Sequence, residues 1–199
     1  MPPYDIGAMK ASLHNVQEEA LRNIRNQFSE FMRGLSDGEM TIASLSRNRL
    51  VNGRYLNTYE DLTSVYRSPG LYIICTTFPM EDNECTFGLH DGLRAIYRGE
   101  CATVMRRLES HLFNKQYRSG YDNRKAEKLD SGGKFSEPYY GACMKIEPGV
   151  SGINIDQGEY ANHSWAVVVL KMFGSSSALR KQAELAFDDL FGKPAASRE

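Results

Sequence analysis

Apolar residues recur at steps of three and four along the first part of the chain, between residues 5 and 35. This spacing places them on one side of an α-helix and predicts a long amphipathic helix. Asp5 is suited to cap its start, and Asp37-Gly38 to end it. The stripe is expected to pack against the rest of the domain, with a helix–helix homodimer seam as the alternative. Its members are Ile6, Met9, Leu13, Val16, Ala20, Ile24, Phe28, Phe31 and Leu35.

Further apolar segments predict strands and helices in a fixed order. Three β-branched, apolar runs without a helical period predict strands at 70–78, 93–99 and 164–173. Apolar residues at helical spacing predict helices at 102–113 and 176–191. The order predicts an α+β (α/β layered) fold, in which a small three-stranded, mainly antiparallel sheet is flanked by helices and preceded by the N-terminal amphipathic helix.

Two segments between these elements lack a clear period. Residues 36–69 are mixed and polar, and Asn52-Gly53 within them predicts a turn. Residues 114–160 are rich in Gly, Lys, Tyr and Ser, which predicts a long insertion. Long ordered loops of this kind are often functional.

Composition narrows the class of protein. The chain has 199 residues, 41% of them hydrophobic and 25% charged, which is the balance of an ordinary globular domain. Its net charge of -1 excludes a globally basic nucleic-acid binder, so any phosphate contact must come from a local patch. The four cysteines form no C-x-x-C pair, which favours free thiols and a cytoplasmic setting. No secretory leader or apolar run of about 20 residues is present, so we expect no membrane partner.

Two short motifs on the first two predicted strands carry the candidate chemistry. The first is Gly70-Leu71-Tyr72, and the second is Ile96-Tyr97-Arg98-Gly99. An arginine-rich helix follows the second motif directly. In this order and context, the motifs resemble those of the GIY-YIG nuclease family.

The family pattern extends to three later positions. It places an arginine ten residues after the second tyrosine, where Arg107 stands, and often a histidine four residues further on, where His111 stands. It also places a glutamate on a helix after the third strand, and Glu184 matches that position. The resemblance covers roughly residues 68–199, which implies a nuclease-like domain there, with the insertion at about 114–160. Residues 1–67 are then an N-terminal helical extension.

The resemblance implies a divalent-metal-dependent endonuclease that hydrolyses phosphodiester bonds in DNA, with RNA not excluded. Tyr72 would take a proton from the attacking water, and Tyr97 would orient the water or the phosphate. Arg107 would bind phosphate oxygens through its planar fork, and His111 would donate to the phosphate or shuttle a proton. Arg107 and His111, four residues apart on one helical face, are expected to point over the sheet rather than into the core. Glu184 would hold Mg²⁺ or Mn²⁺. The alternatives are a nucleic-acid-binding module without catalysis and an interaction protein that uses the N-terminal helix.

The chain departs from the family pattern in three ways. Tyr72 and Tyr97 are 25 residues apart, more than is common in the family, so residues 79–92 must form an enlarged hairpin. Ser197 stands roughly where the family often has an asparagine. Arg98 replaces an apolar residue and is expected on the strand face opposite Tyr97, facing solvent.

Local charge supports a nucleic-acid surface on and after the second predicted helix. Residues 102–135 carry eight Lys or Arg against four Asp or Glu. Tyr117 and Tyr121 lie among them and could stack on bases. The candidate contacts are Arg106, Lys115, Arg118, Arg124 and Lys125.

Overall fold

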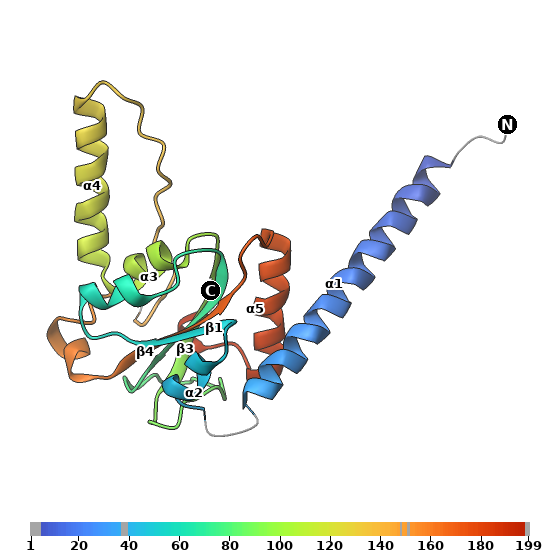
Figure 1. Ribbon diagram of the computed structural model, residues 1–199, viewed down its shortest axis with the longest axis horizontal. Helices are drawn as coiled ribbons and strands as arrows, with labels where there is room; N and C mark the ends of the chain where they lie inside the picture. The colour runs from blue at the N-terminus through green and yellow to red at the C-terminus, as the bar shows by residue number, and fades with distance from the viewer. Residues whose placement is uncertain (1–4, 37–39, 148, 151, 198–199) are drawn as a thin grey trace.

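The computed structural model describes residues 5–36, 40–147, 149–150 and 152–197. These residues form a mixed structure of helices and one antiparallel sheet, as expected (Figure 1). The sheet has four strands in the order β1-β4-β2-β3 rather than the three that the sequence predicts. The strands are β1 (Val51–Tyr55), β2 (Gly70–Thr76), β3 (Arg94–Cys101) and β4 (Trp165–Lys171).

The additional strand, β1, contains the Asn52-Gly53 pair that the sequence predicts to be a turn. That prediction is wrong, because β1 pairs along its whole length with β4. Gly53 instead allows the backbone of α2 to approach β1 closely, because a Cβ at Gly53 would lie 3.2 Å from the backbone oxygen of Ile42. Ile42 begins the short helix α2 (Ile42–Arg47), which packs on β1. The sheet therefore takes an edge strand from residues 1–67.

Helices cover both faces of the sheet. One face carries a core cluster that includes Leu71, Val168 and Phe187 and packs against α1, α2 and α5. The other face carries a cluster that includes Tyr72 and Leu108 and packs against α3, η1 and the segment before β4. The helices are α1 (Ile6–Ser36), α3 (Val104–Leu112), α4 (Asn114–Asp130) and α5 (Ser177–Phe191), with 3-10 turns η1 (Tyr59–Ser64), η2 (Gly158–Asn162) and η3 (Ala195–Ser197).

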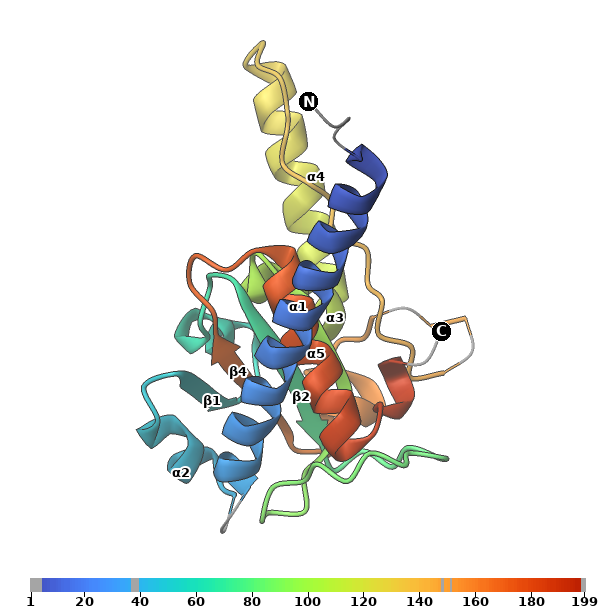
Figure 2. The same ribbon diagram turned by 90° about the vertical axis from the view of Figure 1, so that its right-hand side faces the viewer.

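The predicted N-terminal helix is confirmed as α1, and its start is capped as expected, since the backbone N–H of Ala8 donates to Oδ1 of Asp5 at 3.0 Å. Its C-terminal half packs along α5, whereas its N-terminal half projects beyond the domain (Figure 2). The expected stop at Asp37-Gly38 lies outside the described residues. Among these residues, no helix is both long and apolar enough to cross a membrane.

The first part of the predicted insertion is helix α4, which stands out from the body of the domain beside the returning chain (Figure 1). Aromatic contacts join the two: the rings of Tyr117 and Tyr139 lie 5.5 Å apart, and those of Tyr121 and Phe135 lie 5.2 Å apart. Few other apolar side chains take part, so the sequence shows no helical stripe here. We call α4 and residues 131–140 the arm.

A substitution at Gly70 tests the packing of β2 against β4. A Cβ at Gly70 would lie 2.6 Å from the backbone oxygen of Leu170, so Gly70→Ala must displace one strand. We expect it to lower the free energy of unfolding by about 1–3 kcal/mol, measured by urea denaturation. Gly34→Ala is the matched control, because nothing lies within 4 Å of a Cβ there and alanine favours a helix by up to about 1 kcal/mol. A Gly70→Ala protein as stable as wild type would contradict this packing.

Candidate active site

The two motif tyrosines lie on one face of the sheet. Tyr72 pairs with Gly99 across β2 and β3, so its ring extends over a position without a side chain. A Cβ at Gly99 would lie 2.7 Å from the Tyr72 hydroxyl. Tyr97 packs beside it, with the two ring centroids 6.1 Å apart. The glycine of the second motif thus leaves the space that the first tyrosine fills.

Helix α3 adds His111 to this pair. Its Nε2 lies 3.0 Å from the Tyr72 hydroxyl, and its ring centroid lies 4.8 Å from that of Tyr97. The side chain is fully buried. Burial lowers the pKa of His111 to about 3, and the charge of Arg107 acts in the same direction, so the imidazole is neutral at physiological pH. The expectation that His111 points out over the sheet toward substrate is wrong, because the core encloses it.

Both tyrosines are buried in the same core cluster, and Tyr97 is slightly more accessible, at 7% exposed. Tyr72 is 1% exposed, and its burial raises the pKa of its hydroxyl well above the usual value. Burial raises the pKa of Tyr97 too, and Cys143 and Glu184 act in the same direction, whereas the charge of Arg107 and the neighbouring Tyr72 hydroxyl act in the opposite direction. Among the two, Tyr97 therefore has the environment that better tolerates a phenolate.

Arg107 of α3 is half-buried, and residues 140–143 hold its side chain. Its Nη1 donates to the backbone oxygen of Gly141 at 2.5 Å, and its Nη2 lies 3.0 Å from Sγ of Cys143. Its guanidinium also lies over the ring of Tyr140, 5.8 Å from the centroid. The fork that would bind phosphate is thus occupied by groups of the 140–143 segment in this conformation.

Arg98 and Glu184 meet on the opposite face of the sheet, under α5. Nη1 of Arg98 lies 2.6 Å from Oε1 of Glu184, and its Nε and Nη2 donate to the Asp188 carboxylate at 2.9 and 2.6 Å. Arg98 is 8% exposed, so the expectation that it faces solvent is wrong. The reason is that α5 covers this face and brings two carboxylates to the arginine. Oε2 of Glu184 pairs with Lys181 at 2.5 Å.

The two faces meet in a cleft of about 590 Å³ around the edge strand β3. Among the described residues, its positively charged lining groups are Arg98, Lys145, Lys181 and Lys193, and its one acidic lining residue is Glu184. Tyr97, Ala142, Cys143 and Ser197 complete the wall. Of the residues predicted from the motifs, Tyr97 and Glu184 line this cleft directly. Tyr72 and His111 lie behind Tyr97, and Arg107 reaches the wall through Cys143.

Ser197 holds the position where the family pattern often has an asparagine. Its Oγ accepts a hydrogen bond from the backbone N–H of Arg98 at 3.0 Å. This bond ties η3 to β3 beside the cleft. Ser197 therefore stabilises the edge strand and also presents a hydroxyl to the cleft wall.

The five residues predicted to bind nucleic acid fall into two groups. Lys115, Arg118 and Lys125 are exposed on α4. Arg124 instead forms a two-point ion pair with Glu137 of the returning chain. Arg106 pairs at 2.8 Å with the buried Glu109, which also accepts a hydrogen bond from Tyr59. Arg124 and Arg106 thus have structural partners within the protein.

Sequence reasoning missed the three lysines of the cleft. Lys145 and Lys193 lie in irregular segments, where no periodicity indicates direction. Lys181 precedes Glu184 by three residues on α5, which places both on one helical face. This spacing could have indicated that Lys181 lies beside the candidate metal ligand.

The side chains of the cleft can be compared with those that usually bind a divalent cation. Within the described chain, no group of three or more His, Cys, Asp and Glu could hold a metal. Mg²⁺, however, commonly takes one or two carboxylates together with water and substrate phosphate. Glu184 supplies one such carboxylate on the cleft wall, provided that the half-exposed Lys181 ammonium moves away. Oε1 of Glu184 pairs with Arg98, so a cation at this carboxylate would have to take most of its ligands from water and substrate.

No protein-family model, curated protein or solved structure matches this chain.

The buried His111 predicts a pH dependence of stability. Its folded pKa of about 3 lies below the unfolded value of 6.5, so between these values the unfolded chain binds the extra proton. Stability is fully present above pH 6.5 and falls with pH, by about 2 kcal/mol between pH 7 and pH 5 for this group. Urea denaturation at both pH values measures the loss.

The His111→Gln variant should lose this component, because it has no imidazole to protonate. His14→Gln, at an exposed position on α1, is the matched control and should keep the wild-type dependence. If wild type and His111→Gln showed the same change in stability between pH 7 and pH 5, the burial of a neutral His111 would be disproved.

Proposed function

We propose that this protein is a divalent-metal-dependent endonuclease that hydrolyses phosphodiester bonds in DNA. The observation that carries the proposal is the cleft around β3, where the described lining has three exposed lysines and the paired Arg98 around a tyrosine and a single carboxylate. A phosphodiester is an anion at every working pH, so a cation-lined cleft favours its binding. The tyrosine and the carboxylate supply the groups that hydrolysis needs beside a bound phosphate.

Phosphate binding falls to the cations of the cleft. Lys145, Lys181 and Lys193 each place an exposed ammonium on the wall. Arg107 adds a planar fork once the substrate replaces the backbone oxygen of Gly141 as its partner. Such preformed donors stabilise the charge that grows on the phosphoryl oxygens in the transition state.

We assign the acceptor of the water proton to Tyr97. The motif resemblance assigns this role to Tyr72, but Tyr72 is buried behind Tyr97, whereas Tyr97 lines the cleft. Burial raises the pKa of the Tyr97 hydroxyl, while the charge of Arg107 acts in the opposite direction and favours the phenolate. Tyr72, held in turn by His111, then acts as a positioning residue.

Glu184 would hold Mg²⁺ or Mn²⁺ together with the substrate phosphate. A divalent ion at this carboxylate would supply Lewis-acid stabilisation of the phosphoryl charge and of the leaving oxygen. Arg98 fixes the direction of Glu184 through its pair with Oε1, which leaves Oε2 on the side of the half-exposed Lys181.

The arm extends the proposed surface beyond the cleft. Lys115, Arg118 and Lys125 lie within eleven residues along α4 and are exposed. They suit contacts with phosphates that flank the cleaved bond. Contacts of this kind add affinity without reading sequence, so the arm accepts DNA and RNA alike.

Phenylalanine substitutions separate the two tyrosines. Tyr97→Phe should lower single-turnover cleavage of a labelled DNA duplex by about 100-fold or more, because general-base help is typically of that size. DNA binding should persist, and the wild-type rate should rise toward alkaline pH as the phenolate fraction grows. Tyr72→Phe, the matched control, should lose less activity because its hydroxyl acts only through Tyr97.

Two results would count against this assignment. Cleavage by Tyr97→Phe at near the wild-type rate would remove Tyr97 as the proton acceptor. DNA binding by wild type without any cleavage in Mg²⁺ or Mn²⁺ would leave a nucleic-acid-binding module in place of the nuclease.

Glu184→Gln tests the metal. The amide keeps the size of the side chain but loses the charge, so we expect metal-dependent cleavage to fall by on the order of 100-fold. Mn²⁺ binding in the presence of uncleaved DNA, followed by electron paramagnetic resonance, should weaken in parallel. Asp122→Asn, on the exposed surface of α4, is the control for loss of one carboxylate and should change neither quantity. Unchanged Mn²⁺ binding by Glu184→Gln would place the cation elsewhere.

A further inference from the structure

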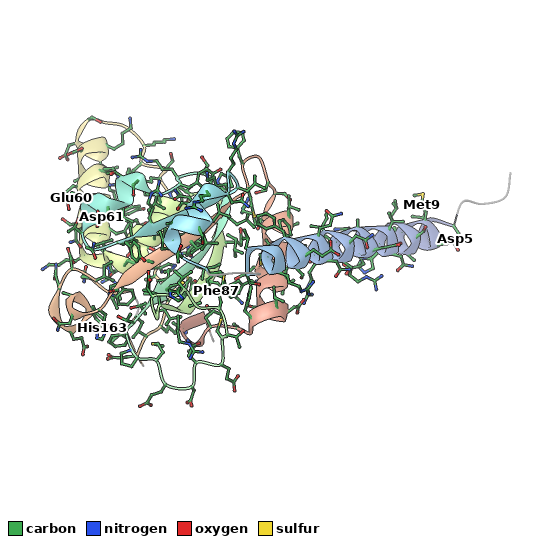
Figure 3. All side chains as sticks on the ribbon, turned by 60° about the horizontal axis from the view of Figure 1, so that its bottom comes forward. Asp5, Met9, Glu60, Asp61, Phe87 and His163 are labelled. Atoms are coloured by element: carbon green, nitrogen blue, oxygen red, sulfur yellow. The ribbon has the colours of Figure 1, made fainter. Side chains whose placement is uncertain are left out.

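The N-terminal half of α1 presents an unpaired apolar stripe. Ile6, Met9, Leu13 and Val16 are 60%, 57%, 61% and 61% exposed. They lie on the part of the helix that projects away from the domain, where Figure 3 labels Met9 and Asp5 near the far end. Scattered single apolar residues are ordinary on a protein surface, but a continuous stripe of this kind marks an interaction site.

The same stripe continues along the helix into the domain. Phe28 and Phe31 continue it at helical spacing and pack against the core. Where the two halves meet, an apolar groove of about 290 Å³ opens beside Ile24, with Leu50 and Leu179 in its wall. The exposed stripe therefore runs directly into an open apolar groove.

We propose that a second copy of this chain covers the stripe, with its α1 packed antiparallel against the first. The steps between Ile6, Met9, Leu13, Val16 and Ala20 are three, four, three and four residues, the spacing of a two-stranded coiled-coil seam. Because a two-fold contact uses the same surface on both copies, one stripe supplies both sides of the interface. The inference is independent of the nuclease activity.

The position of each domain relative to its own α1 favours antiparallel packing of the two helices. From Ile24 onward the stripe faces its own domain, so a parallel partner helix would bring two domains into one space. In the antiparallel arrangement the domains lie at opposite ends of the seam. The start of each partner helix then points toward the groove beside Ile24.

The seam is short, but each helix is anchored to its own domain, and this anchoring offsets the short length. Residues 5–20 span about 24 Å of helix, or roughly two heptads. Free helices of that length are marginal in water, but each α1 here is already held as a helix by its packed C-terminal half. Association therefore needs little further ordering of the backbone.

Sedimentation equilibrium of the full chain tests the proposal. At about 50 µM protein we expect a mass of twice 22.5 kDa. Leu13→Glu should raise the dimer dissociation constant by on the order of 100-fold, because two charges would enter the seam. Ala11→Glu makes the same charge change on the opposite face of the helix and should leave the dimer intact. Equal circular dichroism spectra would show that both variants fold.

Two outcomes would overturn the proposal. One is a wild-type protein that stays monomeric. Binding of that monomer to anionic lipid vesicles would then indicate that a lipid surface covers the stripe instead. The other is equal weakening of the dimer by Leu13→Glu and Ala11→Glu.

Cross-linking tests the direction in a Cys143→Ser background, which removes the exposed thiol. Leu13→Cys, near the centre of the seam, should form a disulfide-linked dimer on oxidation. Ile6→Cys should not, because the two residues would lie at opposite ends of the seam. An efficient Ile6→Cys disulfide would overturn the antiparallel arrangement.

Discussion

The ion pair of Arg98 with α5 is the contact on which the site depends. It joins the edge strand β3 to Glu184 and Asp188 in an almost dry environment. A buried pair of this kind contributes little net stability compared with apolar packing, but breaking it typically costs about 3–5 kcal/mol because a buried charge loses its partner. Its main effect is geometric. It fixes where the Glu184 carboxylate lies relative to the cleft.

On the opposite face of β3, the positions of the aromatic side chains are set by packing and available space rather than by ion pairs. Gly99 leaves room for Tyr72, and Tyr72 in turn supports Tyr97 with His111 behind it. Because side chains alternate along a strand, one edge strand can carry an aromatic cluster on one face and an ion pair on the other. Both reach the cleft at the strand edge. This arrangement accounts for the candidate chemistry with few residues.

The pattern of apolar residues in the sequence was sufficient to predict six elements, because their buried faces are apolar. These are β2, β3, β4, α1, α3 and α5. The pattern failed for β1, because Gly53 accommodates the backbone of α2 rather than a turn. It also failed for α4, which a few tyrosines and an ion pair hold to residues 131–140. Within the site, the alternation along β3 placed Arg98 opposite Tyr97, but only tertiary packing by α5 buries it. Lys145 and Lys193 of the cleft come from irregular segments and carried no signal.

Nicking of supercoiled plasmid DNA in Mg²⁺ tests the central claim that the cleft around β3 binds and cuts nucleic acid. Wild type should nick, and the double variant Lys145→Gln/Lys193→Gln should be slower by about 100-fold, since it lacks two donors to the phosphate. The arm variant Lys115→Gln/Lys125→Gln changes the same charge and should lose less than about tenfold, through affinity alone. Absence of nicking by wild type, or equal losses in the two variants, would contradict the account.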